Sequence, residues 1–504
     1  MFNGTAAAMF DPGDLVSIEF RRHRNSSGVC CCDGRDPERA SPDRRSFRAM
    51  KRLTITIAML VAAACAAPAA DASSRQLLIM QDDALIHMSP TETLDEFASF
   101  GTDVVKVNLY WDHVAPKGRR KPAGFDGADP SSYAWADYGS IAQAIRDRGM
   151  RPYFSIGGRA PDWAAKRRGR RGTYRPSAKE FRLFVQAAGL QFPQVDIWSI
   201  WNEPNLYSWL GPQRRRGTPL SPSIYRGLYL AGHAGLNASG HGGDTILFGE
   251  LMPRGGTDPR KVPPLEFLRE MVCLDRNYRQ YRGAAARRRG CRKVGRIPTS
   301  GFAHHPYTLA NGPGVREGRD EAAIGALSRV RRTLDALARR GKLPRRLPIW
   351  ITEFGYQTRP PDPNATPLRR APSLMDLSEW IAFRNRRVAS YSQYTLRDDE
   401  AWQGGLRFAD GRPKRGVYAA FSLPVLVRSL GGKAVEVFGG GRGAVGATAQ
   451  IESKAPGRSY RSLGSVPVNS AGYFRRIFRV NGASRHTFRV TLGDHRRVKR
   501  PVAR

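Results

Sequence analysis

Two glutamates occupy similar surroundings, each at the end of a run of apolar and β-branched residues. Glu203 follows the run 195–201 in the segment Trp-Asn-Glu-Pro-Asn, and Glu353 ends the run 347–353 in the segment Ile-Thr-Glu-Phe-Gly. Hydrolysis of a glycosidic bond needs one carboxyl group to protonate the leaving oxygen and a second to stabilise the positively charged sugar. A single glutamate beside tryptophans is typical of an ion pair at a loop start. The pair predicts sugar chemistry.

The residues around Glu203 bear on how it could act as an acid. Pro204 disfavours the helical region for the residue before it, so we expect Glu203 to be extended at the tip of its strand. A proton donor must be protonated at the working pH. Burial beside Trp201 and the negative charge of Glu353 are the available means of raising the pKa of Glu203.

The two glutamates can meet only if the elements before them belong to one sheet. Short β-branched runs alternate with helical patterns between residues 76 and 425, and we read eight strands, at 76–80, 104–110, 151–156, 195–201, 245–248, 299–305, 347–353 and 390–395. Helical segments lie between them, at 91–100, 138–148, 178–189, 223–236, 322–340 and 375–388. Eight such units predict an α/β fold, a closed (β/α)8 TIM barrel over 73–430 whose active-site face lies at the carboxyl ends of the strands.

The pattern changes after the barrel. Residues 431–504 contain short alternating runs separated by glycine, asparagine and proline, with candidate strands at 434–438, 447–451, 465–468, 473–480 and 487–492. This is typical of an all-β, sandwich-like accessory module. Residues 432–504 carry 15 basic and 3 acidic side chains and no tryptophan. We therefore expect attachment to an anionic cell-wall polymer sooner than stacking on a neutral glycan.

The two glutamate motifs resemble the fourth- and seventh-strand motifs of clan A glycoside hydrolases, especially families 5 and 39. The resemblance covers residues 76 to about 425. It implies that Glu203 is the general acid/base, that Glu353 is the nucleophile, and that the anomeric configuration is retained. Retention needs carboxyl groups about 5 to 5.5 Å apart, whereas an inverting pair is about 6.5 to 9.5 Å apart.

The same resemblance assigns further substrate-binding positions. Asn202 matches the family's asparagine that contacts the sugar 2-hydroxyl, and His305 and Tyr307 match a histidine-x-tyrosine element whose tyrosine bonds the nucleophile. The alternatives are a turn asparagine and a core histidine. His304 and His305 are adjacent on a strand and point to opposite faces, so we predict no metal site, and the reaction needs no cofactor.

Two positions depart from the family pattern. Lys106 stands on the second strand where many members have arginine, so a point charge replaces a bidentate fork, and we assign it only a supporting role. The eighth strand lacks the tryptophan that often forms a sugar platform, which Trp402 in the following loop can supply. Trp111 follows the second strand and is another stacking candidate. Core packing is the alternative for each tryptophan.

The amino-acid composition and net charge limit the classes of partner that the protein could bind. The chain has 504 residues, 41% hydrophobic and 25% charged, so it is neither disordered nor collagen-like. Its net charge of +38 would suit a nucleic acid. However, the arginines are scattered, and no zinc-finger, RRM or helix-turn-helix signature is present. We therefore expect a poly- or oligosaccharide substrate and no nucleic acid.

Residues 50–72 have a basic start at Met50, an apolar run and a small-residue cleavage site, which predicts a secretory signal peptide. Residues 1–49 would then be a spurious upstream extension. The apolar run is too short for a permanent transmembrane segment. A lipoprotein anchored through Cys65 is the alternative to a secreted protein. In the mature chain only Cys273 and Cys291 remain, which predicts one disulfide.

Together these features predict a secreted retaining glycoside hydrolase that cleaves β-linked sugars with two glutamates. The alternative from another class is a non-catalytic glycan- or wall-binding protein on a TIM-barrel scaffold. The sugar, endo or exo cleavage and the oligomeric state stay open, because loop shape decides them.

Overall fold

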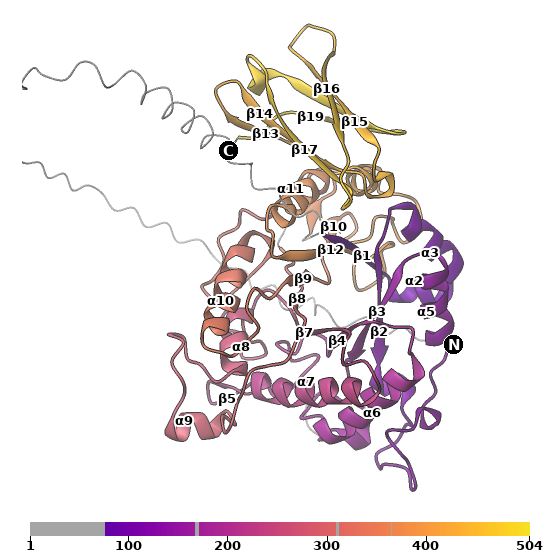
Figure 1. Ribbon diagram of the computed structural model, residues 1–504, viewed down its shortest axis with the longest axis vertical. Coiled ribbons are helices and arrows are strands. Elements are labelled where there is room, and N and C mark those ends of the chain that lie inside the picture. The colour runs from indigo at the N-terminus through magenta and orange to yellow at the C-terminus, as the bar shows by residue number, and fades with distance from the viewer. Residues whose placement is uncertain (1–75, 167–170, 309–311, 364, 504) are drawn as a thin grey trace, which may run out of the picture. The chain divides into compact units, whose positions relative to one another are not determined.

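The barrel is present in the computed structural model, which describes residues 76–166, 171–308, 312–363 and 365–503. Eight parallel strands of the described chain close into one sheet in the order β1-β12-β9-β8-β7-β4-β3-β2 (Figure 1). They are β1 (Leu77–Gln81), β2 (Val104–Tyr110), β3 (Arg151–Gly157), β4 (Ile197–Ile200), β7 (Thr245–Leu251), β8 (Gly301–His304), β9 (Ile349–Ile351) and β12 (Val388–Tyr394). The predicted (β/α)8 barrel is confirmed. The predicted extension 1–49, the signal peptide 50–72 and Cys65 lie outside the described residues.

Helices surround the barrel. They are α2 (Asp83–Met88), α3 (Pro90–Ser99), α4 (Trp111–Val114), α5 (Tyr138–Asp147), α6 (Ala178–Gln191), α7 (Ser221–Ala238), α8 (Pro264–Met271), α9 (Gly283–Arg288), α10 (Leu327–Arg339), α11 (Ala371–Phe383) and α12 (Arg415–Ser422). Two pairs of short strands, β5 (Arg214–Arg215) with β6 (Thr218–Pro219) and β10 (Thr358–Arg359) with β11 (Thr366–Pro367), decorate the loops. Within the described residues, no helix is both long and apolar enough to cross a membrane.

The strands have apolar side chains on both faces because each is covered on both sides. One buried layer fills the barrel interior and consists of Ile79, Val104, Tyr153, Ile197, Leu247, Ala303 and Trp350. The outer faces pack on the helices in a separate, larger core. This double burial explains why the strand runs are nearly continuous in the sequence.

Strand β7 has an irregularity near its carboxyl end. Its register with β8 shifts between Phe248 and Leu251, and Gly249 and Glu250 have φ of +118° and +49°. A Cβ on Gly249 would lie 2.4 Å from the carbonyl oxygen of Ala303, so only glycine fits this backbone. Bulges of this kind re-aim a side chain beside active sites. Here the residue affected is Glu250.

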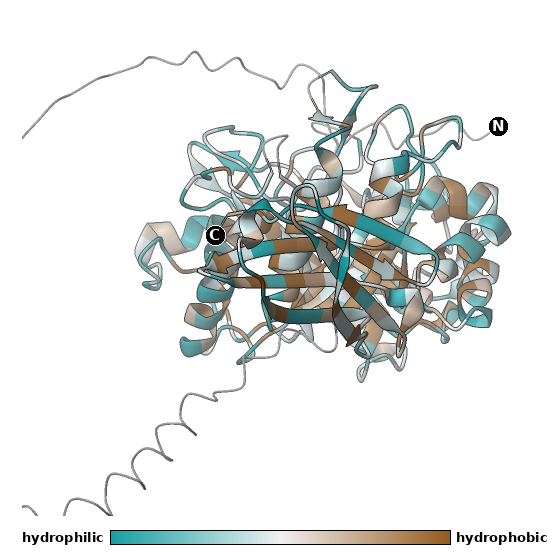
Figure 2. Ribbon diagram, turned by 90° about the horizontal axis from the view of Figure 1, so that it is seen from above, coloured by the Kyte–Doolittle hydropathy of each residue, from teal (hydrophilic) through white to brown (hydrophobic). Residues whose placement is uncertain are grey.

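The C-terminal residues form the predicted all-β module. Its strands are β13 (Val425–Gly431), β14 (Ala434–Gly440), β15 (Thr448–Lys454), β16 (Arg461–Pro467), β17 (Tyr473–Arg479), β18 (Thr487–Leu492) and β19 (His495–Lys499). They pair in the orders β13-β14-β17 and β16-β15-β18-β19, with one apolar core between the sheets. Buried residues alternate with exposed or half-buried ones along β15 and β18, and hydropathy alternates visibly along the module's strands (Figure 2). Strand β13 begins before residue 431, the predicted start of the module.

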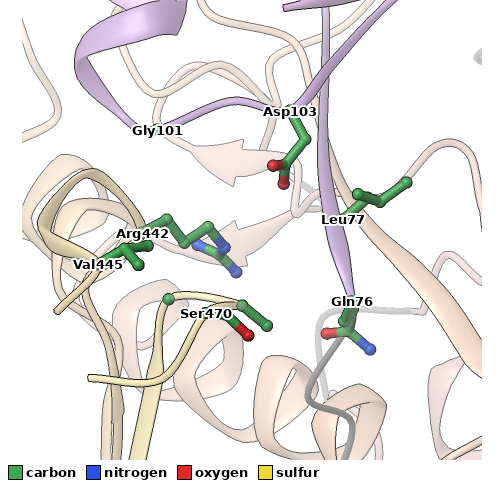
Figure 3. Close-up of a pocket in the computed structure, with 9 residues that line it drawn as sticks. Gln76, Leu77, Gly101, Asp103, Arg442, Val445 and Ser470 are labelled. Atoms are coloured by element: carbon green, nitrogen blue, oxygen red, sulfur yellow. The ribbon is translucent and has the colours of Figure 1, made fainter. Parts of the chain in front are cut away.

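The module is joined to the barrel by buried or half-buried charges, which we call the module contact: Asp376, Glu379, Arg442, Arg497 and Lys499. On α11, Asp376 pairs with Lys499 and, at 3.0 Å, with Arg497, and Glu379 pairs with Arg442. Tyr473 donates to Gln76 at 3.0 Å. A cavity of about 200 Å³ lies here, at the amino ends of β1 and β2 and away from the glutamates (Figure 3).

The predicted disulfide is confirmed. Cys273 and Cys291 are bonded, and the bond closes the arginine-rich segment that includes α9. Arg226 of α7 lies over this segment and donates to the carbonyl oxygens of Met271 and Gly290 at 2.8 and 2.7 Å. The disulfide and these bonds hold a segment that has few apolar residues of its own.

Candidate active site

Glu203 lies in the loop that follows β4, at the carboxyl end of the barrel. Its backbone φ is +34°, in the left-handed region, so the expected extended conformation is wrong. The loop instead turns sharply at Trp201, which also has a positive φ of +70°. Asn205 braces the turn by donating to the carbonyl oxygens of Met252 and Val262 at 2.9 and 3.1 Å. These long-range hydrogen bonds hold the turn against the loop after β7. The backbone preference that Pro204 imposes on Glu203 gives no information about such contacts.

Glu353 follows β9 and is fully buried. Lys106 of β2 donates to its Oε1 at 2.7 Å, and the hydroxyl of Tyr307 donates to its Oε2 at 3.1 Å. Both partners come from positions that the sequence singled out. The hydrogen bond from Tyr307 to Glu353 that the family resemblance implies is therefore present.

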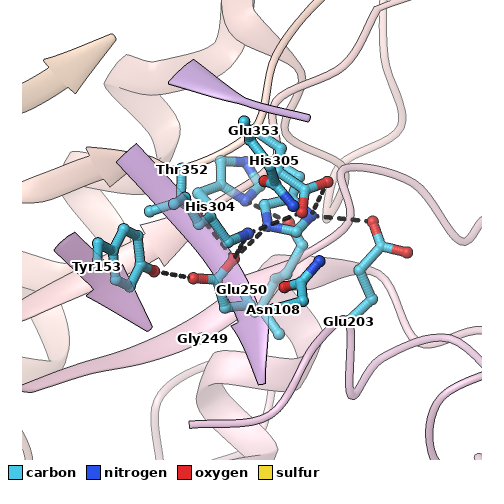
Figure 4. A network of polar contacts seen from close by, with 12 residues as sticks. Asn108, Tyr153, Glu203, Gly249, Glu250, His304, His305, Thr352 and Glu353 are labelled. Atoms are coloured by element: carbon cyan, nitrogen blue, oxygen red, sulfur yellow. Dashed lines mark hydrogen bonds and ion pairs between the residues drawn. The ribbon is translucent and has the colours of Figure 1, made fainter. Parts of the chain in front are cut away.

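His305 joins the two glutamates. Its Nδ1 lies 3.1 Å from Oε1 of Glu203 and 3.4 Å from Oε2 of Glu353 (Figure 4). The neighbouring His304 faces away, with its ring between the carbonyl oxygens of Leu251 and Ala322. The expectation that the two histidines point to opposite faces is confirmed, and the two carboxylates face one small volume.

A third acid, Glu250 at the end of β7, completes the cluster and was missed by the sequence reading. It is fully buried and accepts hydrogen bonds from Tyr153, from Nε2 of His305, from Lys106 at 3.1 Å and from Thr352 at 2.9 Å. Figure 4 shows dashed contacts running from Tyr153 through Glu250 to the histidine and on to Glu203. We call Glu203, Glu250 and Glu353 the acid cluster. The available signal was an acid just beyond the apolar run 245–248.

The electrostatic environment separates the acids. Burial raises the pKa of Glu203, the charge of Glu353 raises it further, and His305 opposes the shift. Burial also disfavours the charge of Glu250, but Lys106 and His305 outweigh it and hold the pKa of Glu250 well below its usual range. The environment therefore favours the neutral form of Glu203 and the ionised form of Glu250.

The cationic groups respond in the opposite sense. Burial alone would lower the pKa of His305, but Glu353 and Glu250 raise it to about 9. The same two acids raise the pKa of Lys106 against the effect of burial. Lys106 is thus a permanent cation in the barrel interior. The supporting role expected for it from the sequence corresponds to its ion pairs with Glu250 and Glu353.

The remaining predicted residues divide into two groups. Asn202 is buried, and its Oδ1 has no hydrogen-bond partner among the described residues. Trp402 lies beside Tyr307, with ring centres 4.9 Å apart, and donates to the carbonyl oxygen of Tyr394 at 2.9 Å. Trp111 is not brought to the site: it is 0% exposed and stacks on Phe184 in the outer core.

One group of side chains in the described residues is close enough to hold a metal ion: Glu250, His305 and Glu353. The ammonium group of Lys106 already contacts both acids of this group. A cation of the protein itself therefore stands among these ligand atoms, and we assign no metal to them.

No family model matches the chain, and no curated protein matches it. Among solved structures, it is similar to a β-1,4-D-mannanase from Cryptopygus antarcticus at 11% identity, over 70% of this chain and 93% of that one, with a TM-score of 0.39. An endocellulase from Pyrococcus horikoshii aligns at 12% identity over 69% and 92%, with a TM-score of 0.37. An endo-1,4-β-mannanase from Eisenia fetida aligns at 9% identity over 69% and 93%, with a TM-score of 0.36. These likenesses are too distant to bear on activity.

Proposed function

We propose that this protein is a retaining glycoside hydrolase acting on a β-linked poly- or oligosaccharide, with Glu203 as general acid/base and Glu353 as nucleophile. The observation that carries the proposal is the single ring nitrogen of His305 shared by both carboxylates. The two oxygens that face this nitrogen cannot be further apart than the sum of its two distances. This upper bound of about 6.5 Å includes the separation of about 5 to 5.5 Å of a retaining pair, and the resemblance of the two glutamate motifs favours double displacement.

The first step uses the two acids in opposite protonation states. Glu353 attacks the anomeric carbon as a carboxylate, and its charge is maintained by Lys106 at 2.7 Å. The bond to the leaving oxygen breaks as Glu203 transfers its proton to that oxygen. Burial raises the pKa of Glu203 and so favours the protonated form that this step needs.

The second step reverses these roles. Glu203, now a carboxylate, takes a proton from water, and the water oxygen attacks the anomeric carbon of the glycosyl ester. The ester bond to Glu353 breaks, and the free carboxylate returns to its bonds with Lys106 and Tyr307. No group outside the chain is consumed except water.

Secretion and wall attachment belong to the same proposal. Residues 50–72 direct export, and the basic C-terminal module retains the enzyme on an anionic cell-wall polymer. N-terminal sequencing of the exported protein should find the start near residue 73. Fatty acylation of Cys65 would instead establish the lipoprotein form. Deletion of 431–504 should weaken retention on wall material, and unchanged retention would remove the module from the proposal.

The decisive experiment is a screen of the purified protein on aryl β-glycosides and polysaccharides, with the first-formed anomer followed by NMR. We expect release of the β-anomer. A 2-fluoro-glycoside should label the peptide that contains Glu353. Glu353→Gln should lose at least about 10³-fold in kcat. Sugar binding without turnover in both proteins would favour a non-catalytic binder, and the α-anomer as first product would exclude double displacement.

A further inference from the structure

Glu250 has no role in the two steps above, yet it has the most partners of the acid cluster. Its oxygens accept hydrogen bonds from the side chains of Tyr153, Lys106, Thr352 and His305. These donors come from β2, β3 and the ends of β8 and β9, and all of them are buried. A carboxylate held from four directions, on a backbone that the bulge at Gly249 re-aims, is fixed in place.

We propose that Glu250 is a positioning residue of the active site: it keeps a proton on Nε2 of His305, so that Nδ1 of the same ring shares the catalytic proton with Glu203. The inference rests on the proposed function, because this shared proton has a catalytic use only if Glu203 is the general acid. It adds a third acid to the two that the reaction itself requires.

The donor and acceptor roles of the two ring nitrogens of His305 support this assignment. An ionised carboxylate only accepts, so Nε2 must donate to Glu250. In a neutral imidazole the other nitrogen is then an acceptor. Oε1 of Glu203 lies 3.1 Å from that nitrogen and can donate to it when protonated. If the proton moves to Nδ1, the imidazolium donates to the Glu203 carboxylate, so one proton lies between the two groups in either case.

The charges around His305 point the same way. The acids that face the ring are Glu203, Glu250 and Glu353, from the loop after β4, from β7 and from the loop after β9. The lysine of this group is Lys106, and the hydroxyls of Tyr153 and Tyr307 stay protonated because burial raises their pKa well above its usual range. Three carboxylates therefore face one permanent cation, and a proton must be retained within the group.

This arrangement also links the proton to the covalent step. The charge of Glu353 helps to raise the pKa of Glu203. When Glu353 becomes an ester, that charge disappears, and the pKa of Glu203 falls. Glu203 is then a carboxylate when water must be activated, while Glu250 holds the ring unchanged.

The test is ¹⁵N NMR of the intact protein labelled at histidine, with the His305 signals assigned from their loss in His305→Gln. In the wild type, we expect a proton on Nε2 throughout and titration at Nδ1 above the ordinary histidine pKa of about 6.5. Glu250→Gln should lower the apparent pKa of His305 by about 1 to 3 units. An unchanged titration, or a proton on Nδ1 alone in the neutral wild type, would overturn the proposal.

Two further variants serve as a control and as an independent test. Glu379→Gln makes the same change in a buried acid of the module contact and should leave the His305 titration as in the wild type. Tyr153→Phe removes a donor to Glu250, so more of the Glu250 charge acts on His305, and the apparent pKa should rise. If Glu250→Gln does not fold, the rise in the apparent pKa of His305 in Tyr153→Phe still tests the proposal. A lower or unchanged pKa of His305 in that variant would contradict it.

Kinetics separates this inference from the proposed function. With an active enzyme, Glu250→Gln should lower kcat/KM more for aryl glycosides with poor leaving groups than for those with good ones, because only the former need the proton in the first step. Equal losses would indicate a merely structural role. If the wild type is inactive but shows the expected NMR titration, the proposed hydrolase activity is refuted and the proton shared between His305 and Glu203 is retained. If the enzyme is active but the titration is absent, only the role proposed for Glu250 is refuted.

Discussion

The acid cluster and the module contact both bury acids, but they balance them with different numbers of cations. In the acid cluster, three carboxylates meet Lys106 and a histidine. In the module contact, Asp376 and Glu379 meet Arg442, Arg497 and Lys499. Where permanent cations match or exceed the acids, each charge has a fixed partner and the region only holds the fold together. Where they fall short, a proton has to be shared, and a shared proton can do chemistry.

Lys106→Met should have the largest effect, because it removes the lysine that pairs with Glu250 and Glu353 of the acid cluster. Loss of one partner from a buried charge pair costs about 3 to 5 kcal/mol. If that loss falls on the ionised nucleophile, kcat/KM drops by about 10²- to 10⁴-fold. The measurement is steady-state hydrolysis of the best aryl glycoside from the screen.

Lys106→Arg is the matched control, because it keeps the charge and changes the geometry, and it should retain more activity than Lys106→Met. Equal activity of Lys106→Met and the wild type would show that the lysine does not maintain the charge of Glu353.

Asp376→Asn should destabilise the fold by about 3 to 5 kcal/mol, since it leaves Arg497 and Lys499 without their buried acid. Urea unfolding gives this loss directly. The kcat per folded molecule should stay as in the wild type, since Asp376 lies outside the acid cluster.

Asp95→Asn is the exposed counterpart, because Asp95 pairs with Arg148 and its side chain is 62% exposed. Its loss should stay below about 1 kcal/mol. Similar losses for the two variants would mean that burial does not strengthen the module contact.

The disulfide lies outside both the acid cluster and the module contact, so its removal should affect stability alone. Cys273→Ser combined with Cys291→Ser should cost about 3 kcal/mol, the value expected for a loop of this length. The kcat/KM pH profile should not move. A displaced pH profile would show that the arginine-rich segment influences the acid cluster, which would contradict this expectation.

The smallest expected effect is on stability against pH. The pKa of His305 is raised from its ordinary 6.5 to about 9, so its contribution is fully present below about pH 6.5 and is lost as pH rises toward 9. Between pH 7 and pH 8 this group should lower the free energy of unfolding by about 1 kcal/mol. Urea unfolding at the two pH values measures it. His305→Gln should flatten this slope, and an unchanged slope would assign the pH dependence to other groups.

Prediction from sequence succeeded where a residue's own neighbours decide its place. Glu203 and Glu353 end apolar runs, and barrel closure brings the ends of such runs to one face. Tyr307 and Lys106 were singled out by comparison with the clan A glycoside hydrolase pattern. Trp111 was misplaced, because stacking on Phe184 depends on α6, whose contact with α4 no local pattern shows. Glu250 was missed because its inward aim comes from a register shift between two strands.

The barrel, the all-β module, the disulfide and the two glutamates at strand ends could all be predicted from the sequence, because they follow from local periodicity and residue type. Only the tertiary structure decided that Glu250 joins them, that Glu203 lies on a left-handed turn, and that one histidine nitrogen faces both Glu203 and Glu353. The physical reason is that burial and charge act between strands distant in the chain. Their balance exists only once the barrel has closed.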